Sequence, residues 1–276
     1  MKQISSRDNP RFKALRALAD DPRETRRQGS VLLDGVHLVG VCVEHGIPLQ
    51  LLVISETASD NAEIGALLAA SPSTEVIQLP DAMFRATSSV ATPVGIAGLI
   101  TLPADASEDI DGDAVILDAV QDAGNVGAIL RSAAAAGVRH IVLGKGCAGA
   151  WTPRVLRAGQ GAHFSLRIRE GIELDTWLAE RPALAASSLA TVAAMSSGAV
   201  SLFDLDLRAG SPVAWLFGNE GAGLSPSLVA LAGRQTTIPL QAATESLNVA
   251  ASAAVCLFEA VTQRYEARRR LTRADS

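Results

Sequence analysis

Two loops near the C-terminal end carry polar side chains that neither turn geometry nor core packing requires. The first loop, residues 218–224, is rich in glycine and follows the apolar run 213–217. The second lies between Leu240 and Asn248, behind a short segment that begins at Thr236. Either loop alone is consistent with an ordinary turn. Small polar loops that leave parallel strands at one edge of a sheet are, however, typical of ligand sites in α/β proteins. Glu220 and Asn248 are therefore candidate functional residues.

These loops require a parallel sheet with helices on its faces. Short apolar runs bounded by turn residues predict buried strands at 114–117, 140–143, 166–168, 184–188 and 213–217. The segments between them predict helices at 125–137, 153–161 and 173–180, a short helix that Ser225-Pro226 opens, and a long helix to about Arg270. Ser246 is the predicted N-cap of that last helix.

A smaller α/β domain is expected ahead of this one. Helices are predicted at 8–20, 37–44 and 61–70, and strands at 31–33, 51–54, 76–79 and 94–101. A polar, acidic stretch after Leu102 is typical of a linker. We therefore predict an N-terminal domain at 1–102, a linker at 103–112 and a C-terminal domain at 113–276.

Composition predicts a soluble, cytoplasmic protein. The chain has 276 residues and is 48% hydrophobic, enough for substantial cores. No apolar run follows the first lysine, so no signal peptide is expected. The uncharged run 182–203 is long enough to span a membrane, but it contains serine, threonine and glycine. We interpret it as strand, loop and turn, and expect no membrane partner.

Cysteine and histidine spacing argues against a metal site. The cysteines at 42, 147 and 256 are far apart and form no CxxC pair. The histidines at 37, 45, 140 and 163 are equally scattered. Surface or core positions explain all of these residues.

Charge is distributed unevenly along the chain, although the net charge is only −5. Residues 1–30 carry eight basic and four acidic side chains, whereas residues 31–112 carry one basic and eleven acidic ones. The basic arm, with Arg7, Arg11 and Lys13, is a candidate contact for a nucleic acid. A solvated amphipathic helix explains the same charges without a partner.

The sequence Gly144-Lys145-Gly146-Cys147-Ala148-Gly149 matches the GxGxxG pattern of dinucleotide-binding sites. That pattern must open a helix in the first βαβ unit, yet Trp151-Thr152-Pro153 follow here. No acidic residue ends the next predicted strand, 166–168, about 20 residues on, where a ribose partner belongs. We interpret the match as a loop, with a dinucleotide enzyme as a third hypothesis.

Three blocks taken together carry a stronger signal. They are the segment 118–133 with Asn125 and Arg131, the segment 217–224 with Glu220, and Ile238-Pro239-Leu240 with residues 245–250. In order and spacing they resemble the three motifs of the SpoU (TrmH-type) branch of the SPOUT RNA methyltransferases. The resemblance covers essentially all of 114–265. Residues 30–100 are also similar to the ribosomal-protein-like α/β substrate-binding domain often found ahead of it.

The resemblance implies a C-terminal SPOUT domain with a deep trefoil knot, which is rare among folds. It also implies S-adenosyl-L-methionine as cofactor, a homodimer, no metal, and methyl transfer to a ribose 2′-hydroxyl of RNA. By position it assigns cofactor contacts to Gly218, Asn219, Ile238, Leu240, Ser246 and Leu247. It assigns the active site to Asn125, Arg131, Glu220, Ser246 and Asn248. The departure is Ala123, where the family usually has proline.

Arg131 is the family's usual candidate for the general base. A free guanidinium costs roughly 7 kcal/mol to deprotonate at pH 7, at about 1.36 kcal/mol per pKa unit. We therefore expect Arg131 to clamp a phosphate and stabilise the developing alkoxide, and to act as a base only when RNA desolvates it. Asn125 and Asn248 would orient these groups, while Glu220 would hold either an arginine or the loop. Arg154 and Arg157 would line the RNA path, although a polar helix face explains them too.

The sequence does not identify the target RNA. Domain layout favours ribosomal RNA over transfer RNA by resemblance alone, because RNA shape recognition is not legible in one sequence. A transfer RNA methyltransferase and a non-catalytic RNA-binding module that retains the fold are the alternatives.

Overall fold

The computed structural model describes residues 1–106, 109–181, 190–195, 200–208, 212–241 and 246–274. Two compact units form: Met1–Ala104 with Gly149–Phe164, and Asp105–Ala148 with Ser165–Ser276. The first unit thus includes a segment that the sequence boundaries give to the C-terminal domain. The predicted strand at 184–188 lies outside the described residues.

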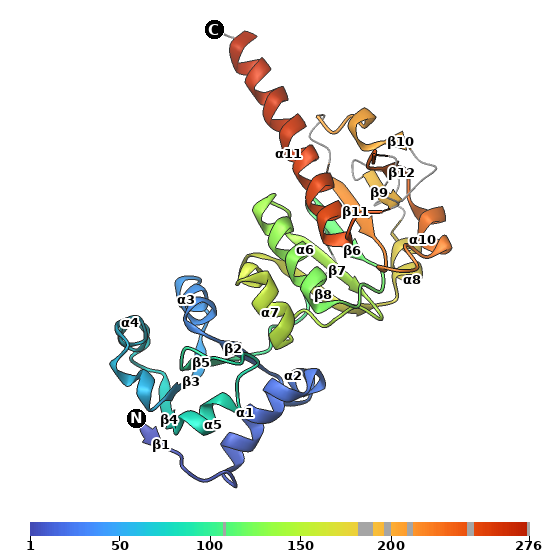
Figure 1. Ribbon diagram of the computed structural model, residues 1–276. Helices are drawn as coiled ribbons and strands as arrows, with labels where there is room; N and C mark the ends of the chain where they lie inside the picture. The colour runs from blue at the N-terminus through green and yellow to red at the C-terminus, as the bar shows by residue number, and fades with distance from the viewer. Residues whose placement is uncertain (107–108, 182–189, 196–199, 209–211, 242–245, 275–276) are drawn as a thin grey trace. The chain divides into compact units, whose positions relative to one another are not determined.

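The N-terminal unit contains one mixed sheet with helices on both faces (Figure 1). Its elements are β1 (Lys2–Gln3), α1 (Pro10–Asp20), α2 (Pro22–Gln28), β2 (Ser30–Asp34), α3 (Val36–Glu44), β3 (Leu49–Ser55), η1 (Thr57–Asp60), α4 (Ala62–Ala70), β4 (Glu75–Leu79), α5 (Asp81–Arg85), β5 (Ile96–Thr101), α7 (Pro153–Gly159) and η2 (Ala162–Ser165). The strand order is β1-β4-β3-β5-β2. Strand β5 is antiparallel to both of its neighbours.

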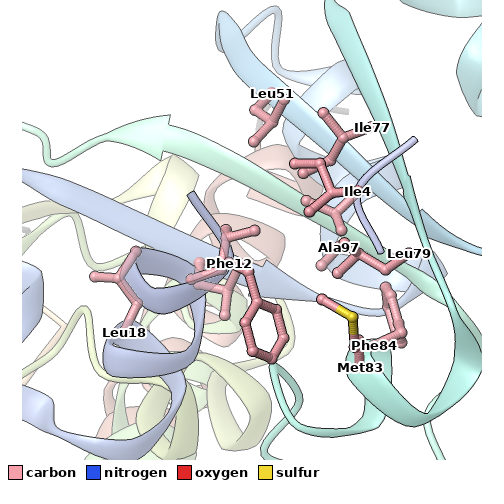
Figure 2. Packing of buried hydrophobic residues seen from close by; sticks show 12 residues of the cluster. Ile4, Phe12, Leu18, Leu51, Ile77, Leu79, Met83, Phe84 and Ala97 are labelled. Atoms are coloured by element: carbon pink, nitrogen blue, oxygen red, sulfur yellow. The ribbon is translucent and has the colours of Figure 1, made fainter. Parts of the chain in front are cut away.

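One face of this sheet packs against α1 and α5. Phe12, Leu15 and Leu18 recur on one side of α1 and are buried against alternate residues of the strands, among them Val53 and Ile77 (Figure 2). Asn9 caps α1 through its side chain, and Pro10 occupies the first turn, as the sequence predicts. The short elements β1, α2 and α5 carry too little periodicity to be predicted.

The C-terminal unit contains a seven-stranded sheet in which every pair of strands is parallel. Its elements are β6 (Ala114–Leu117), α6 (Ala123–Ala135), β7 (His140–Gly144), β8 (Arg167–Ile172), α8 (Leu174–Ala179), β9 (Ala190–Met195), β10 (Val200–Ser201), η3 (Leu202–Asp204), β11 (Val213–Phe217), α10 (Pro226–Leu231), β12 (Arg234–Thr237) and α11 (Val249–Ala274). The strand order is β10-β12-β9-β11-β6-β7-β8. The parallel sheet predicted from the apolar runs is confirmed.

Helices cover both faces of this sheet. Trp177 and Leu178 of α8 and Leu228 of α10 pack on one face, against alternate residues of β6 and β11. Helices α6 and α11 pack together, and their inward residues, such as Ile129 and Leu257, are buried. The central strands are buried on both sides, which explains their continuous apolar runs.

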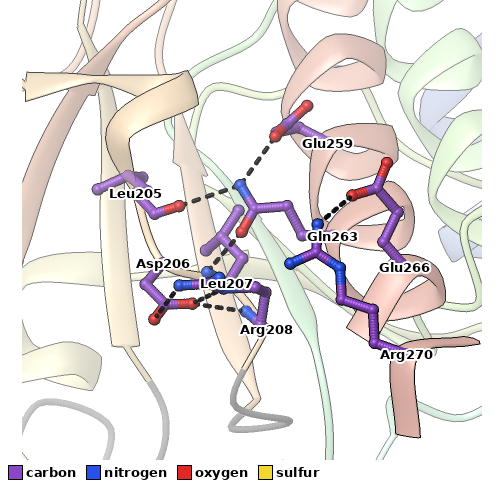
Figure 3. A network of polar contacts seen from close by, with 8 residues as sticks. All are labelled: Leu205, Asp206, Leu207, Arg208, Glu259, Gln263, Glu266 and Arg270. Atoms are coloured by element: carbon purple, nitrogen blue, oxygen red, sulfur yellow. Dashed lines mark hydrogen bonds and ion pairs between the residues drawn. The ribbon is translucent and has the colours of Figure 1, made fainter. Parts of the chain in front are cut away.

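Helix α11 is also tied to the segment that precedes β11. The side-chain nitrogen of Gln263 donates to the Leu205 carbonyl at 3.0 Å, and its side-chain oxygen accepts from the backbone amide of Leu207 at 2.9 Å (Figure 3). Asp113, at the foot of β6, accepts from the Val213 amide and pairs with Arg264. These contacts fix α11 against β6 and β11, the strands that lead to residues 118–122 and to the 218–224 loop.

Candidate active site

A pocket of about 470 Å³ lies where the loops after β11 and β12 meet the start of α11. Its volume falls within the roughly 300–1,000 Å³ of small-molecule sites. The predicted cofactor contacts all line it: Gly218, Asn219, Ile238, Leu240, Ser246 and Leu247. Strands β11 and β12 are both parallel to β9, which lies between them, so their carboxyl ends share one edge of the sheet. That arrangement is the one predicted from the two loops.

The 218–224 loop is a tight hairpin that only glycine permits at its first position. A Cβ atom on Gly218 would lie 2.2 Å from the Gly223 carbonyl carbon and the Leu224 nitrogen. Asn219 and Gly223 exchange two backbone hydrogen bonds of 2.9 Å. The Asn219 side-chain oxygen accepts from the amides of Gly221 and Ala222. The loop backbone is therefore shaped before any ligand binds.

A strained turn after β6 holds this hairpin from the other side. Ala119 has φ 51°, in the left-handed region that non-glycine residues rarely adopt. Its carbonyl accepts from the Asn219 side-chain amide at 2.8 Å, and an Asp118 oxygen accepts from the Ser225 amide at 2.8 Å. Asp118 and Ala119 are thus functional candidates that sequence reasoning missed. A polar residue at the end of a buried strand was the available signal.

Three polar side chains from the three blocks form one chain of hydrogen bonds. The Asn248 amide nitrogen donates to the Asn125 side-chain oxygen at 2.9 Å. The Asn125 amide nitrogen donates in turn to Glu220 at 3.0 Å. Glu220 also accepts from the backbone amides of Gln121 and Asp122 at 3.3 and 3.1 Å. Glu220 therefore bonds to the 121–125 segment, and no arginine in the described ranges pairs with it.

The charge of Glu220 is stabilised where it lies. Burial acts to raise the pKa of this carboxyl, but hydrogen bonds from the Asn125 side chain and the backbone amides outweigh it and lower the pKa. Cys256 lies in the pocket wall, and burial raises the pKa of its thiol to about 12. Because the thiol stays protonated at neutral pH, we assign it a packing role.

Helix α6 begins two residues earlier than predicted. Asp122 is the N-cap of α6, and its side-chain oxygen accepts from the backbone amide of Asn125 at 2.8 Å. Ala123 thus occupies the first helical position, where proline is favoured because the N–H has no intrahelical partner. Alanine at this position leaves the cap and Asn125 in place.

The predicted cap of α11 is wrong. The Asn248 side-chain oxygen accepts from the amides of Ala250 and Ala251, and its carbonyl accepts from the Ser252 amide. Asn248 is therefore the N-cap, and Ser246 lies outside the helix, in the pocket wall. Both residue types make good caps, so the sequence could not choose between positions two residues apart.

Arg131 stands apart from the pocket wall. It lies on α6, six residues beyond Asn125, and is exposed. Its guanidinium forms no hydrogen bond or ion pair with any residue that the structure describes. The charge is thus available to an anionic ligand.

The predicted RNA contacts fall in the N-terminal unit. Arg154 and Arg157 are exposed on α7, which packs against β2. Arg7 is exposed as well, whereas Arg11 pairs with Glu75 and Lys13 pairs with Asp8. Ion pairing therefore compensates part of the basic N-terminal arm.

The GxGxxG match has a packing explanation. A Cβ on Gly144 would lie 2.6 Å from the Leu174 side chain, so this glycine lets α8 approach β7 closely. Helix α7 begins at Pro153, four residues after Gly149.

Within the described ranges no three potential metal ligands cluster. None of the helices traced in those ranges is long and apolar enough to cross a membrane.

Comparisons with known proteins identify the family. The pattern of the SpoU rRNA Methylase family matches residues 113–258, and that of the MRM3-like substrate binding domain matches residues 9–98. The chain belongs to the SpoU rRNA methylase family. The predicted family and the predicted substrate-binding domain are both confirmed.

SpoU relatives match over nearly the whole chain. A 23S rRNA (uridine(2479)-2′-O)-methyltransferase of Streptomyces viridochromogenes is 30% identical over 97% of this chain and 94% of its own. A 23S rRNA (guanosine(2553)-2′-O)-methyltransferase of Bacillus subtilis is 31% identical over 94% of this chain and 98% of its own. The SpoU methyltransferase AviRb of Streptomyces viridochromogenes, solved in complex with AdoMet, superposes with a TM-score of 0.82 and 29% identity, covering 93% of this chain and 98% of its own.

Proposed function

We propose that this SpoU protein transfers a methyl group from S-adenosylmethionine to a ribose 2′-hydroxyl of ribosomal RNA. The observation that carries the proposal is the chain of hydrogen bonds from Asn248 through Asn125 to Glu220. It joins the first SpoU block to the two blocks that line the pocket. Two SpoU relatives of similar length carry names of 23S rRNA 2′-O-methyltransferases.

The pocket suits the cofactor. Ile238, Leu240 and Leu247 offer apolar surface for a purine ring, and the backbone of residues 218–224 offers amides and carbonyls at close range. Bound there, S-adenosylmethionine would supply an electrophilic methyl group from its sulfonium sulfur and leave as S-adenosylhomocysteine, while the 2′-hydroxyl proton would pass to solvent. Asn219, Ser246 and the pinned hairpin would hold the cofactor, and the shape of this wall would set the direction of the methyl group.

Arg131 would then act on the RNA. Its exposed guanidinium is not committed to any described partner, so it can bind a ribose-adjacent phosphate and stabilise negative charge on the 2′-oxygen. We expect Arg131→Ala to retain cofactor binding and to lose methyl transfer by at least about a hundredfold. Undiminished turnover in that variant would exclude this role.

We also propose a homodimer that uses the exposed face of the first half of α11, around Phe258, and leaves the last turns of this helix uncovered. Phe258 on α11 is 44% exposed and Phe203 on the contacting η3 is 55% exposed, which is unusual for two phenylalanines on adjoining elements. Light scattering of Phe258→Asp tests the proposal, since a charge in that face should give a monomer. The trefoil knot, the RNA-binding role of residues 1–102 and cytoplasmic localisation stay predictions.

The decisive experiment supplies purified protein with tritiated S-adenosylmethionine and either unmodified large-subunit rRNA or unmodified transfer RNA. Label at one ribose of the rRNA, mapped by resistance of the 3′ linkage to alkaline cleavage, is the expected result. Label in transfer RNA alone would move the substrate to that class. RNA binding without cofactor binding, measured by calorimetry, would leave only the non-catalytic module.

A further inference from the structure

The carboxyl-terminal turns of α11 carry three consecutive exposed arginines, Arg268, Arg269 and Arg270, called here the α11 arginine cluster. Figure 1 shows these turns extending past the sheet of their unit. Consecutive helical residues point about 100° apart, so the three side chains spread over more than half of the helix circumference. The cluster is therefore open to a large ligand.

The charge of this cluster is poorly compensated. Arg270 lies 3.8 Å from Glu266, an exposed contact that contributes little (Figure 3). Arg268 and Arg269 form no ion pair with any residue in the described ranges. By contrast, Arg16 pairs with Asp20 at 3.2 Å, and Arg27 pairs with Glu24 at 2.7 Å. The three adjacent guanidinium groups at the end of α11 thus carry accessible positive charge, whereas ion pairs compensate part of the N-terminal arm.

Helix stability alone explains only part of this pattern. Cations near a helix carboxyl terminus interact favourably with its dipole, and that effect is confined to the last turn. Three arginines exceed what one turn needs, and an aromatic ring adjoins them. The Arg269 guanidinium lies 5.8 Å from the ring centre of Tyr265, which is 60% exposed. Arginine beside an exposed aromatic ring is a typical surface for nucleic-acid backbone and bases.

The distance between the α11 arginine cluster and the pocket sets a minimum size for a ligand that contacts both sites. Arg269 is 21 residues beyond Asn248 on one continuous helix, which corresponds to about 30 Å at 1.5 Å per residue. A free nucleotide cannot span that length. A folded RNA can, and its phosphates would face the arginines while one ribose lies at the pocket.

We propose that the α11 arginine cluster is a second RNA-binding surface that grips substrate RNA about 30 Å from the methylated ribose. The inference rests on the proposed function. It assigns the cluster to substrate affinity and to no chemical step. It also predicts that long RNA substrates gain from the cluster and short ones do not.

The test compares the full-length protein with Arg268→Gln/Arg269→Gln/Arg270→Gln, since glutamine keeps helix propensity and removes charge. The probes are two transcripts centred on the mapped methylation site, one of about 100 nucleotides and one just long enough to be methylated. We expect KM for the long transcript to rise at least tenfold, with kcat and cofactor affinity unchanged. Because each lost phosphate contact removes counterion release, the slope of log K for RNA binding against log salt concentration should become shallower by about two to three. The short transcript should be unaffected.

Two matched variants separate charge from fold. The triple lysine variant keeps the charge and should behave almost as wild type. Lys145→Gln/Arg167→Gln/Arg208→Gln removes three basic side chains that have acidic partners and lie outside the basic N-terminal arm, and it should change KM less than twofold. A long-transcript KM within twofold of wild type in the cluster variant would overturn the inference. So would a change in oligomeric state by light scattering, which would assign the cluster to a second copy of the chain. If the wild type methylated no RNA, the proposed function itself would fail.

Discussion

Gly218 is the residue where side-chain size should matter most. A methyl group there would meet loop backbone at 2.2 Å, so Gly218→Ala must move the hairpin. We expect a loss of roughly 1–3 kcal/mol in folding free energy and at least tenfold weaker cofactor binding. Thermal unfolding and calorimetry measure the two effects. Gly221→Ala is the control, because its methyl group would approach no closer than 3.6 Å. Equal cofactor affinity in both variants would contradict the role of Gly218.

Ala123 offers a gain in stability. It lies at the first helical position of α6, and Asp122 before it is extended, with φ −74° and ψ 121°. Both positions are compatible with proline at 123. We expect Ala123→Pro to raise the free energy of unfolding by about 0.4–1 kcal/mol by restricting the unfolded chain. Urea unfolding checks this, and a destabilised variant would show that the α6 start is not as described.

Ionised Glu220 should contribute to folding stability at neutral pH, and this contribution should be lost in acid. Hydrogen bonds lower its folded pKa below the ordinary value of 4.5. A depressed pKa means that the stabilisation is complete above the unfolded pKa and is lost as the pH falls through the folded pKa. We therefore expect Glu220→Gln to be less stable than wild type at pH 7, with the gap narrowing below about pH 4.5. Unfolding midpoints from pH 3 to 7 measure it, and a gap independent of pH would refute the assignment.

Helix α11 and the pocket share one residue, Asn248, whose two roles can be separated. Asn248→Ala removes the cap and should cost roughly 1 kcal/mol in folding free energy. Asn248→Asp keeps an oxygen for the Ala250 and Ala251 amides but cannot donate to Asn125. We expect Asp to retain stability and lose methyl transfer, because two acceptors would then face each other. Thermal unfolding with single-turnover assays tests this, and full activity of the Asp variant would contradict it.

At the scale of elements, local patterns predicted what local forces determine. The run 213–217 is a strand at the predicted bounds because burial on both faces requires continuous apolar residues. The short elements β1 and α5 were missed because they carry little periodicity. Helix α2 was missed for the same reason, although Asp21, Pro22 and Gly29 mark its two ends. In the site, the family resemblance placed the pocket wall. The bonds from Asn248 to Asn125 and from Asn125 to Glu220 join residues 123 and 95 positions apart, so no local pattern contains them.

At the scale of the whole molecule, the boundaries of the two compact units differ from a simple division at the predicted linker. Segment 149–164 follows β7 in sequence but belongs to the compact unit of residues 1–104. Within that unit α7 packs on β2, and the backbone at Gly161 leaves no room for a methyl group beside Val41. A division of the chain at the predicted linker would therefore separate α7 from the sheet that buries it.

A fragment of residues 113–276 tests this directly. In the full chain Val155 and Leu156 of α7 are completely buried. Helix α7 packs on β2, so we expect removal of residues 1–104 to expose part of its apolar surface, and the fragment to bind a hydrophobic dye and to associate. Val155→Ser/Leu156→Ser in the fragment should reduce both effects, whereas the same change in the full chain should destabilise it, because it leaves two buried hydroxyl groups in an apolar core. Dye fluorescence and light scattering report the outcome. A monodisperse fragment that binds no dye would show that α7 needs nothing from the N-terminal unit.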